Sequence, residues 1–125
     1  MKKLVVMLLI IVSVFAIAVP AMAASINAIP GTKNPGPEFR FDGGDNVSVS
    51  VSATLQSGDI VRVFLDVYNP ERSQFLERDS IKFQNSGNNN GTLSYKLDSN
   101  ETRVRIRTYG YEANSGTIKV TYSFR

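Results

Sequence analysis

The segment Asp59-Ile60-Val61-Arg62-Val63-Phe64-Leu65-Asp66-Val67-Tyr68 decides the fold class of this chain. Its odd positions from 61 to 67 are all apolar and form one row at the strand period of two. The opposite row is mixed and consists of Ile60, Arg62, Phe64, Asp66 and Tyr68. Gly58 before the segment and Asn69-Pro70 after it are residues that end a strand. The pattern predicts a central β-strand.

Six further segments show strand patterns and are separated by turn residues. They are Glu38–Phe41, Asn46–Leu55, Gln74–Gln84 with a bulge or edge near 77–79, a strand through Leu93, Tyr95 and Leu97, a strand through Val104, Ile106 and Thr108, and Ile118–Phe124. Asn85–Gly91 and Tyr109–Gly116 are expected to be exposed loops. About seven strands with no helical period beyond residue 23 predict an all-β, antiparallel β-sandwich of immunoglobulin-like or jelly-roll type.

The turn between the first two of these strands constrains their pairing. A two-residue hairpin at Gly43-Gly44 would place Phe41 opposite Asn46 and so mix core and solvent residues on one face. Either the loop holds an odd number of residues, or the two strands lie in different sheets.

The first 23 residues have the features of a cleaved signal peptide. Lys2 and Lys3 precede an apolar run from Leu4 to Val19, and Ala21-Met22-Ala23 supplies the small residues of a cleavage site. Residues 24–37, rich in proline and glycine, are expected to form a loosely held extended arm, and residues 38–125 to form the β-sandwich domain. We therefore expect a secreted, extracellular or cell-envelope-associated bacterial protein without a membrane span after cleavage.

The composition argues against most enzyme classes. The chain contains no histidine, cysteine or tryptophan, so triads and dyads built on imidazole or thiol and ordinary zinc or copper sites cannot form. A pair of carboxylates remains formally possible among the 11 acidic residues. Without the leader the chain has about 12 basic residues and a net charge near +1, so nothing indicates a nucleic-acid partner. We expect a protein that is not an enzyme.

Arg103, Arg105 and Arg107 are the most unusual feature of the sequence. At strand spacing all three side chains leave one face, opposite the inward Val104 and Ile106. Lys119 would join them if the last two strands pair. Two readings stay open. The arginines could pair with acids on neighbouring strands, such as Asp66 or Glu101, or they could bind a polyanion.

Two smaller clusters accompany the arginine row. Tyr109 and Tyr111 suit sugar or peptide binding beside arginines, although packing explains such residues as well. Asp42 and Asp45 could hold calcium in an oxygen-rich turn, or bond their own backbone as turn aspartates commonly do. No other cofactor is expected.

A set of strand and turn residues is similar to the pre-peptidase C-terminal domains of secreted bacterial hydrolases. The set comprises Phe39-x-Phe41, Gly43-Gly44-Asp45, the alternating valines of 46–55, Asp66-Val67-Tyr68, Tyr109-Gly110-Tyr111, Gly116 and Ile118-Lys119-Val120-Thr121-Tyr122. The resemblance implies a secreted sandwich with a role in adhesion or solubility and no chemistry of its own. Those domains usually follow an enzyme, whereas the leader-like residues 1–23 lead us to expect no enzyme before this one.

Three hypotheses of function follow. The first is a non-catalytic module that binds an anionic polymer, a carbohydrate or a protein at a cell surface through the arginine row and the neighbouring tyrosines. The second is a secreted effector, such as a toxin, antagonist or protease inhibitor, acting through the loops at 85–91 or 109–116. The third is a surface protein that assembles by edge pairing. The sequence leaves the ligand and the oligomeric state open.

Overall fold

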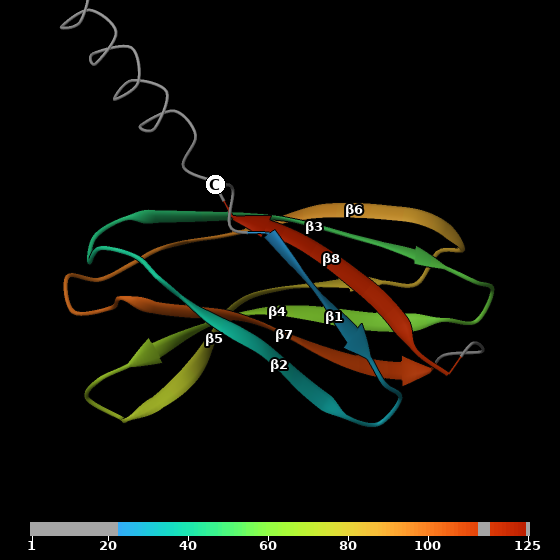
Figure 1. Ribbon diagram of the computed structural model, residues 1–125, viewed down its shortest axis with the longest axis horizontal. Helices are drawn as coiled ribbons and strands as arrows, with labels where there is room; N and C mark the ends of the chain where they lie inside the picture. The colour runs from blue at the N-terminus through green and yellow to red at the C-terminus, as the bar shows by residue number, and fades with distance from the viewer. Residues whose placement is uncertain (1–22, 113–115, 125) are drawn as a thin grey trace, which may run out of the picture.

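Eight strands in two four-stranded antiparallel sheets make up the part of the protein that the structure describes (Figure 1). The computed structural model describes residues 23–112 and 116–124, so the leader predicted at 1–23 lies outside it except for Ala23. The strands are β1 (Ala23–Ala28), β2 (Lys33–Arg40), β3 (Asn46–Leu55), β4 (Ile60–Asn69), β5 (Gln74–Phe83), β6 (Gly87–Lys96), β7 (Arg103–Glu112) and β8 (Ile118–Phe124). None of the described segments is a helix able to cross a membrane.

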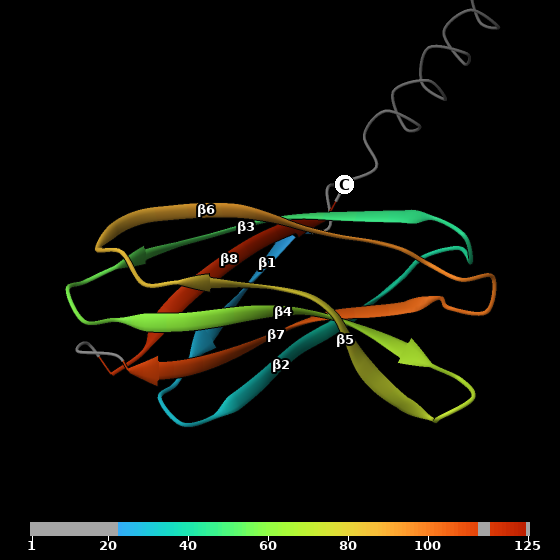
Figure 2. The ribbon, with the colours of Figure 1, turned by 180° about the vertical axis from the view of Figure 1, so that it is seen from behind.

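The sheets have the strand orders β1-β8-β3-β6 and β2-β7-β4-β5. Figures 1 and 2 show them as two layers, with β3 and β6 in the upper one and β4 and β7 in the lower one. Only β4 and β5 are joined as a hairpin within one sheet, and every other connection crosses between the sheets. This order is that of an eight-stranded jelly roll, which settles the alternative that the sequence left open.

The predicted central strand is β4, an inner strand of its sheet. Its row from Val61 to Val67 is fully buried and faces the alternating valines of β3 across the sandwich. β3 has the predicted bounds Asn46–Leu55 and the predicted alternation of buried and outward residues. The core therefore forms where the two cleanest sequence patterns face each other.

The strands on either side of Gly43-Gly44, β2 and β3, lie in different sheets and do not pair. The sequence allowed this arrangement as one of two ways to keep core and solvent residues on separate faces. Phe39 and Phe41 both point inward from the lower layer. Their rings lie 4.8 and 5.5 Å from that of Phe124 on β8. Aromatic contacts thus join the two layers near the end of the chain.

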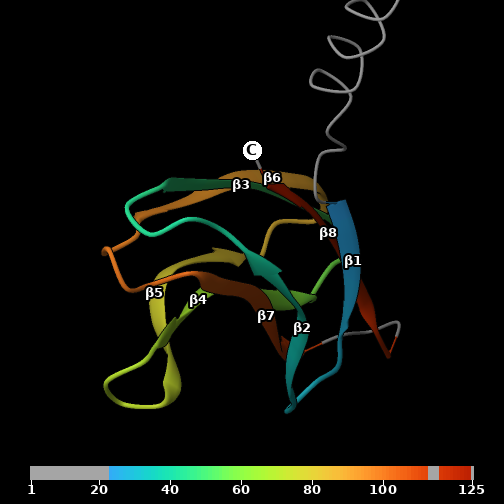
Figure 3. The ribbon, with the colours of Figure 1, turned by 60° about the vertical axis from the view of Figure 1, so that its left-hand side comes forward.

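The expected loose arm at 24–37 is instead largely two edge strands. β1 pairs with β8, β2 pairs with β7, and Figure 3 shows β1 and β2 next to each other. Pro35 and Pro37 hid this strand in the sequence, but an edge strand tolerates residues that lack an N–H donor. The pairing register of β2 shifts between Pro35 and Glu38.

Both predicted loops are shorter than expected. β6 begins at Gly87, and Asn88, Asn89 and Asn90 pair with β3, so most of the predicted loop at 85–91 is strand. β7 likewise continues to Glu112, and 113–115 lie outside the described residues. The interruption near 77–79 is confirmed, because the β4–β5 register skips Arg78. Main-chain pairing to β3 has outweighed the turn preference of the asparagines.

Tyr122 yields a first stability prediction. Its side chain is buried between the sheets, its hydroxyl has no hydrogen-bond partner among the described residues, and burial raises the pKa of its phenol. Tyr122→Phe should therefore stabilise the protein by about 1 kcal/mol at neutral pH. Denaturant unfolding followed by circular dichroism would measure this.

The pH dependence of that difference follows from the direction of the shift. A raised phenol pKa in the folded state gives stability that is present below the unfolded value near 10 and is lost as the pH rises through the folded value. The advantage of Tyr122→Phe over the wild type should therefore grow above about pH 10. A variant that is less stable than the wild type at both neutral and alkaline pH would contradict this account.

Candidate functional site

The three arginines project from the outer face of β7, as predicted. Val104 and Ile106 between them are fully buried, while the arginine side chains are 33, 25 and 14% exposed from Arg103 to Arg107. Lys119 does not join them, because β8 belongs to the other sheet. The prediction for Lys119 assumed that the last two strands pair, and that assumption is wrong.

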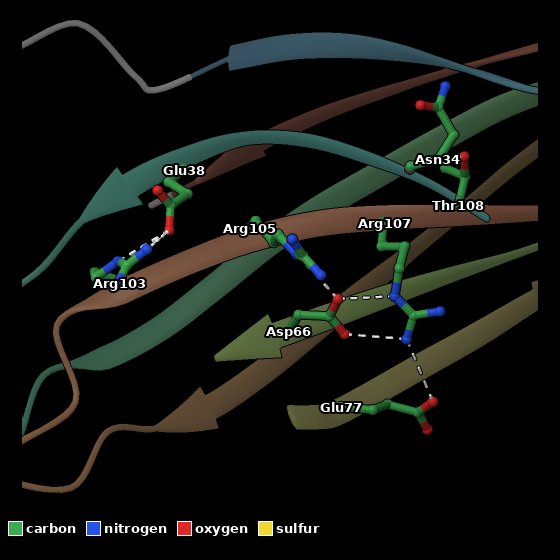
Figure 4. A network of polar contacts seen from close by, with 8 residues as sticks. All are labelled: Asn34, Glu38, Asp66, Glu77, Arg103, Arg105, Arg107 and Thr108. Atoms are coloured by element: carbon green, nitrogen blue, oxygen red, sulfur yellow. Dashed lines mark hydrogen bonds and ion pairs between the residues drawn. The ribbon is translucent and has the colours of Figure 1, made fainter. Parts of the chain in front are cut away.

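Asp66 lies at the centre of the arginine row (Figure 4). Its side chain is 2% exposed, and its Oδ2 atom accepts hydrogen bonds from Nε of Arg107 at 2.8 Å and Nε of Arg105 at 3.3 Å. Glu77 lies 3.9 Å from a terminal nitrogen of Arg107, and Glu38 accepts from Nε of Arg103 at 2.9 Å. Cross-strand pairing with acids, one of the two readings from sequence, is therefore correct for all three arginines.

Glu101 does not take part in this pairing. Its carboxylate is buried and lies 3.3 Å from Arg78 of β5. Hydrogen bonding to this carboxylate, added to the larger effect of burial, raises the pKa of Tyr95. Glu101 thus belongs to a separate structural network at the β6–β7 turn.

Aromatic rings lie beneath the guanidinium groups. The guanidinium carbons of Arg103, Arg105 and Arg107 are 4.0, 3.9 and 4.0 Å from the ring centres of Tyr68, Phe75 and Phe64, respectively. These rings come from the outer rows of β4 and β5. Each arginine thus covers an aromatic ring and also pairs with a carboxylate. Its guanidinium group therefore has few N–H donors left for an external ligand.

The other end of the outer face of the β2-β7-β4-β5 sheet carries a different set of side chains from the arginine row. We call it the tyrosine end and define it by Lys33, Arg62, Lys82, Tyr109 and Tyr111. Cross-strand pairs place Tyr109 opposite Lys33 and Arg62, and Arg62 opposite Lys82. The two tyrosine rings lie 4.8 Å apart, and Lys82 lies 5.6 Å from the centre of the Tyr111 ring. Side chains of one charge and an exposed aromatic surface meet here.

Among residues 24–111 and 116–124, no carboxylate pairs with the cations of the tyrosine end. The contacts recorded there are from Arg62 to the hydroxyl of Ser80 at 3.1 Å and from Lys82 to Tyr111. Tyr111 is 46% exposed. Sequence reasoning named both tyrosines but missed Lys33, Arg62 and Lys82, because placing them on one face requires the strand order.

Asp45 bonds the backbone of its own turn, which is one of the two interpretations drawn from the sequence. Asp45 turns its carboxylate back to accept a hydrogen bond from the backbone N–H of Asp42 at 3.0 Å. In residues 23–112 and 116–124, no group of three or more acidic, histidine or cysteine side chains could hold a metal ion. With one carboxylate bonded to its own turn, this pair offers few free ligands for calcium, and calcium binding there stays an untested expectation.

Comparison with known proteins adds little. The chain matches no protein-family model, and a search of curated proteins finds no significant match. Among solved structures, it is similar to the CBM22-2 xylan-binding domain of Xyn10C from Paenibacillus barcinonensis, with a TM-score of 0.46 and 10% identity over 85% of this chain and 87% of that one. Similarity at this level says nothing about the ligand of this chain. The β-sandwich implied by the pre-peptidase C-terminal resemblance is present, while the resemblance itself gains no support.

Proposed function

We propose that this protein is a secreted, non-catalytic domain that binds an acidic polysaccharide of the cell surface through the tyrosine end. The observation that carries the proposal is the gathering of three cations around the paired rings of Tyr109 and Tyr111. Lys33 and Arg62 lie opposite Tyr109, and Lys82 lies against the exposed Tyr111. Among residues 24–111 and 116–124, no carboxylate pairs with these cations. Arg62 and Lys82 lie directly opposite each other, and like charges in such a pair repel unless an anion binds between them. The leader-like residues 1–23 support an extracellular location.

The two kinds of side chain would divide the recognition of such a ligand. An exposed tyrosine ring offers a flat apolar surface for the C–H face of a sugar ring, and its hydroxyl can bond a sugar hydroxyl. Lysine and arginine attract carboxylate, sulfate or phosphate groups on the chain. The arginine row at the other end would hold the sheet face rigid rather than form the main contacts.

A binding measurement with matched variants tests the proposal. Isothermal titration against soluble polygalacturonate should show binding of the acidic chain that weakens as salt rises. Lys82→Ser combined with Tyr111→Ser should weaken that binding by at least about tenfold.

Lys96→Ser provides the control, because Lys96 is an exposed lysine on β6 of the other sheet. It should leave polygalacturonate binding unchanged. Equal affinities for the wild type and the double variant, or affinities that do not respond to salt, would rule out the tyrosine end as the site.

A further inference from the structure

The outer face of the β1-β8-β3-β6 sheet carries an open groove that the proposed function does not use. One lobe has a volume of about 800 Å³ and a second, adjoining lobe about 430 Å³. The lobes share Ser52, Asn90, Lys119 and Thr121. They therefore form one continuous depression across the sheet.

The pairing register explains why the sheet is hollowed along β3. Ser50 and Ser52 are central outward residues of this inner strand, and their side chains are among the smallest available. Ser52 lies opposite Thr121 of β8 on one side and opposite Asn90 of β6 on the other. The longer side chains of Asn90 and Thr121 therefore flank Ser52, and the serines of β3 form the bottom of the groove.

Most of the residues that line the groove carry neutral hydrogen-bonding groups. Serine, threonine and asparagine predominate among the described lining residues, no acidic residue is among them, and Lys119 is their single cation. Side chains of serine, threonine and asparagine lose little conformational entropy when a ligand fixes them. Such a surface matches a ligand that both donates and accepts many hydrogen bonds and carries no charge.

Several of these groups are already held in place by one another. The hydroxyls of Ser52 and Thr121 lie 2.6 Å apart, and the hydroxyl of Thr54 donates to Oδ1 of Asn88 at 2.8 Å. Each hydroxyl keeps further capacity to bond a ligand. Mutual bonding fixes the side chains before a ligand arrives and lowers the entropic cost of binding.

We propose that this groove binds a neutral polysaccharide chain lying along β3. The chain would contact Ser50, Ser52 and Asn90, with Lys119 donating to ring hydroxyls. The site is independent of the tyrosine end, since the two lie on opposite faces of the sandwich. Apart from the acidic chain that the other face would take, the protein thus has a second ligand of a different charge class.

Titration with three soluble neutral polysaccharides, namely dextran, mixed-linkage β-glucan and galactomannan, tests this second site. At least one should bind, with an affinity that stays the same as salt rises, because no ion pairs form. Ser52→Gln, which fills the floor, should weaken binding by at least about tenfold, and Asn90→Ala should weaken it several-fold by removing an amide.

Ser48→Gln is the matched control, because Ser48 is an outward serine of the same strand outside the groove lining. It should leave neutral-glycan binding unchanged, as should the double variant of Lys82 and Tyr111. The proposal fails if none of the three glycans binds, if salt abolishes the binding, or if Ser52→Gln and Asn90→Ala both bind like the wild type. Thermal unfolding of each variant separates lost binding from lost folding, and Asn90→Ala remains informative if Ser52→Gln does not fold.

Discussion

Replacing Asp66 with Asn is expected to lower the free energy of unfolding by about 3 kcal/mol. The carboxylate of Asp66 is 2% exposed and is the shared partner of Arg105 and Arg107. An amide cannot supply the missing charge, and its NH₂ group would face guanidinium donors that also need an acceptor. The melting temperature should fall by roughly 15 °C for a domain of this size. Thermal and urea unfolding of the two proteins would measure both quantities.

Glu38→Gln is the matched control for that substitution. Glu38 also pairs with an arginine of the row, Arg103, but its side chain is 43% exposed. Water screens this pair, so its loss should cost less than about 1 kcal/mol. Similar losses in the two variants would mean that the burial of Asp66 has no special weight and that the arginine row is held mainly by its aromatic contacts.

Much of the fold can be predicted from the sequence, because the inward rows of β3 and β4 are unbroken. A row of valines at period two has one favourable arrangement, with its apolar side against another such row. The edge strands could not be found this way. β2 contains two prolines, and both β1 and β2 show little apolar alternation. They are strands because β8 and β7 offer them hydrogen-bonding partners.

The candidate sites likewise include features that one strand's sequence predicts and features that depend on which strands are neighbours. The outward direction of the arginines follows from Val104 and Ile106 alone, since parity within one strand is local. The direction of Lys119 relative to them depends on which strands are neighbours, and no local pattern encodes that. The tyrosine end and the serine-floored groove are both assembled from three or four strands. The outward serines of β3 were visible in the sequence, but only the sheet shows what stands beside them.

Glu101 organises a second buried charge network, away from both proposed binding surfaces. Its side chain is 1% exposed, and its Oε1 atom accepts hydrogen bonds from the backbone N–H of Asp98 at 2.7 Å and from the hydroxyl of Tyr95 at 3.1 Å. Arg78 donates to Oε2 at 3.3 Å and lies 5.2 Å from the centre of the Tyr95 ring. The bulge in β5 leaves Arg78 out of the ladder, which frees it to reach this carboxylate.

Glu101→Gln should therefore cost about 3 kcal/mol of unfolding free energy, because it leaves the partly buried Arg78 without a counter-charge. Tyr95→Phe, which removes one hydrogen bond and keeps the charge pair, should cost only about 1 kcal/mol. Glu71→Gln in the exposed β4–β5 turn should change stability by less than about 0.5 kcal/mol and serves as the control. Urea unfolding curves of the three variants decide the matter. If Glu101→Gln were no more costly than Tyr95→Phe, the ion pair between Glu101 and Arg78 would contribute nothing to stability.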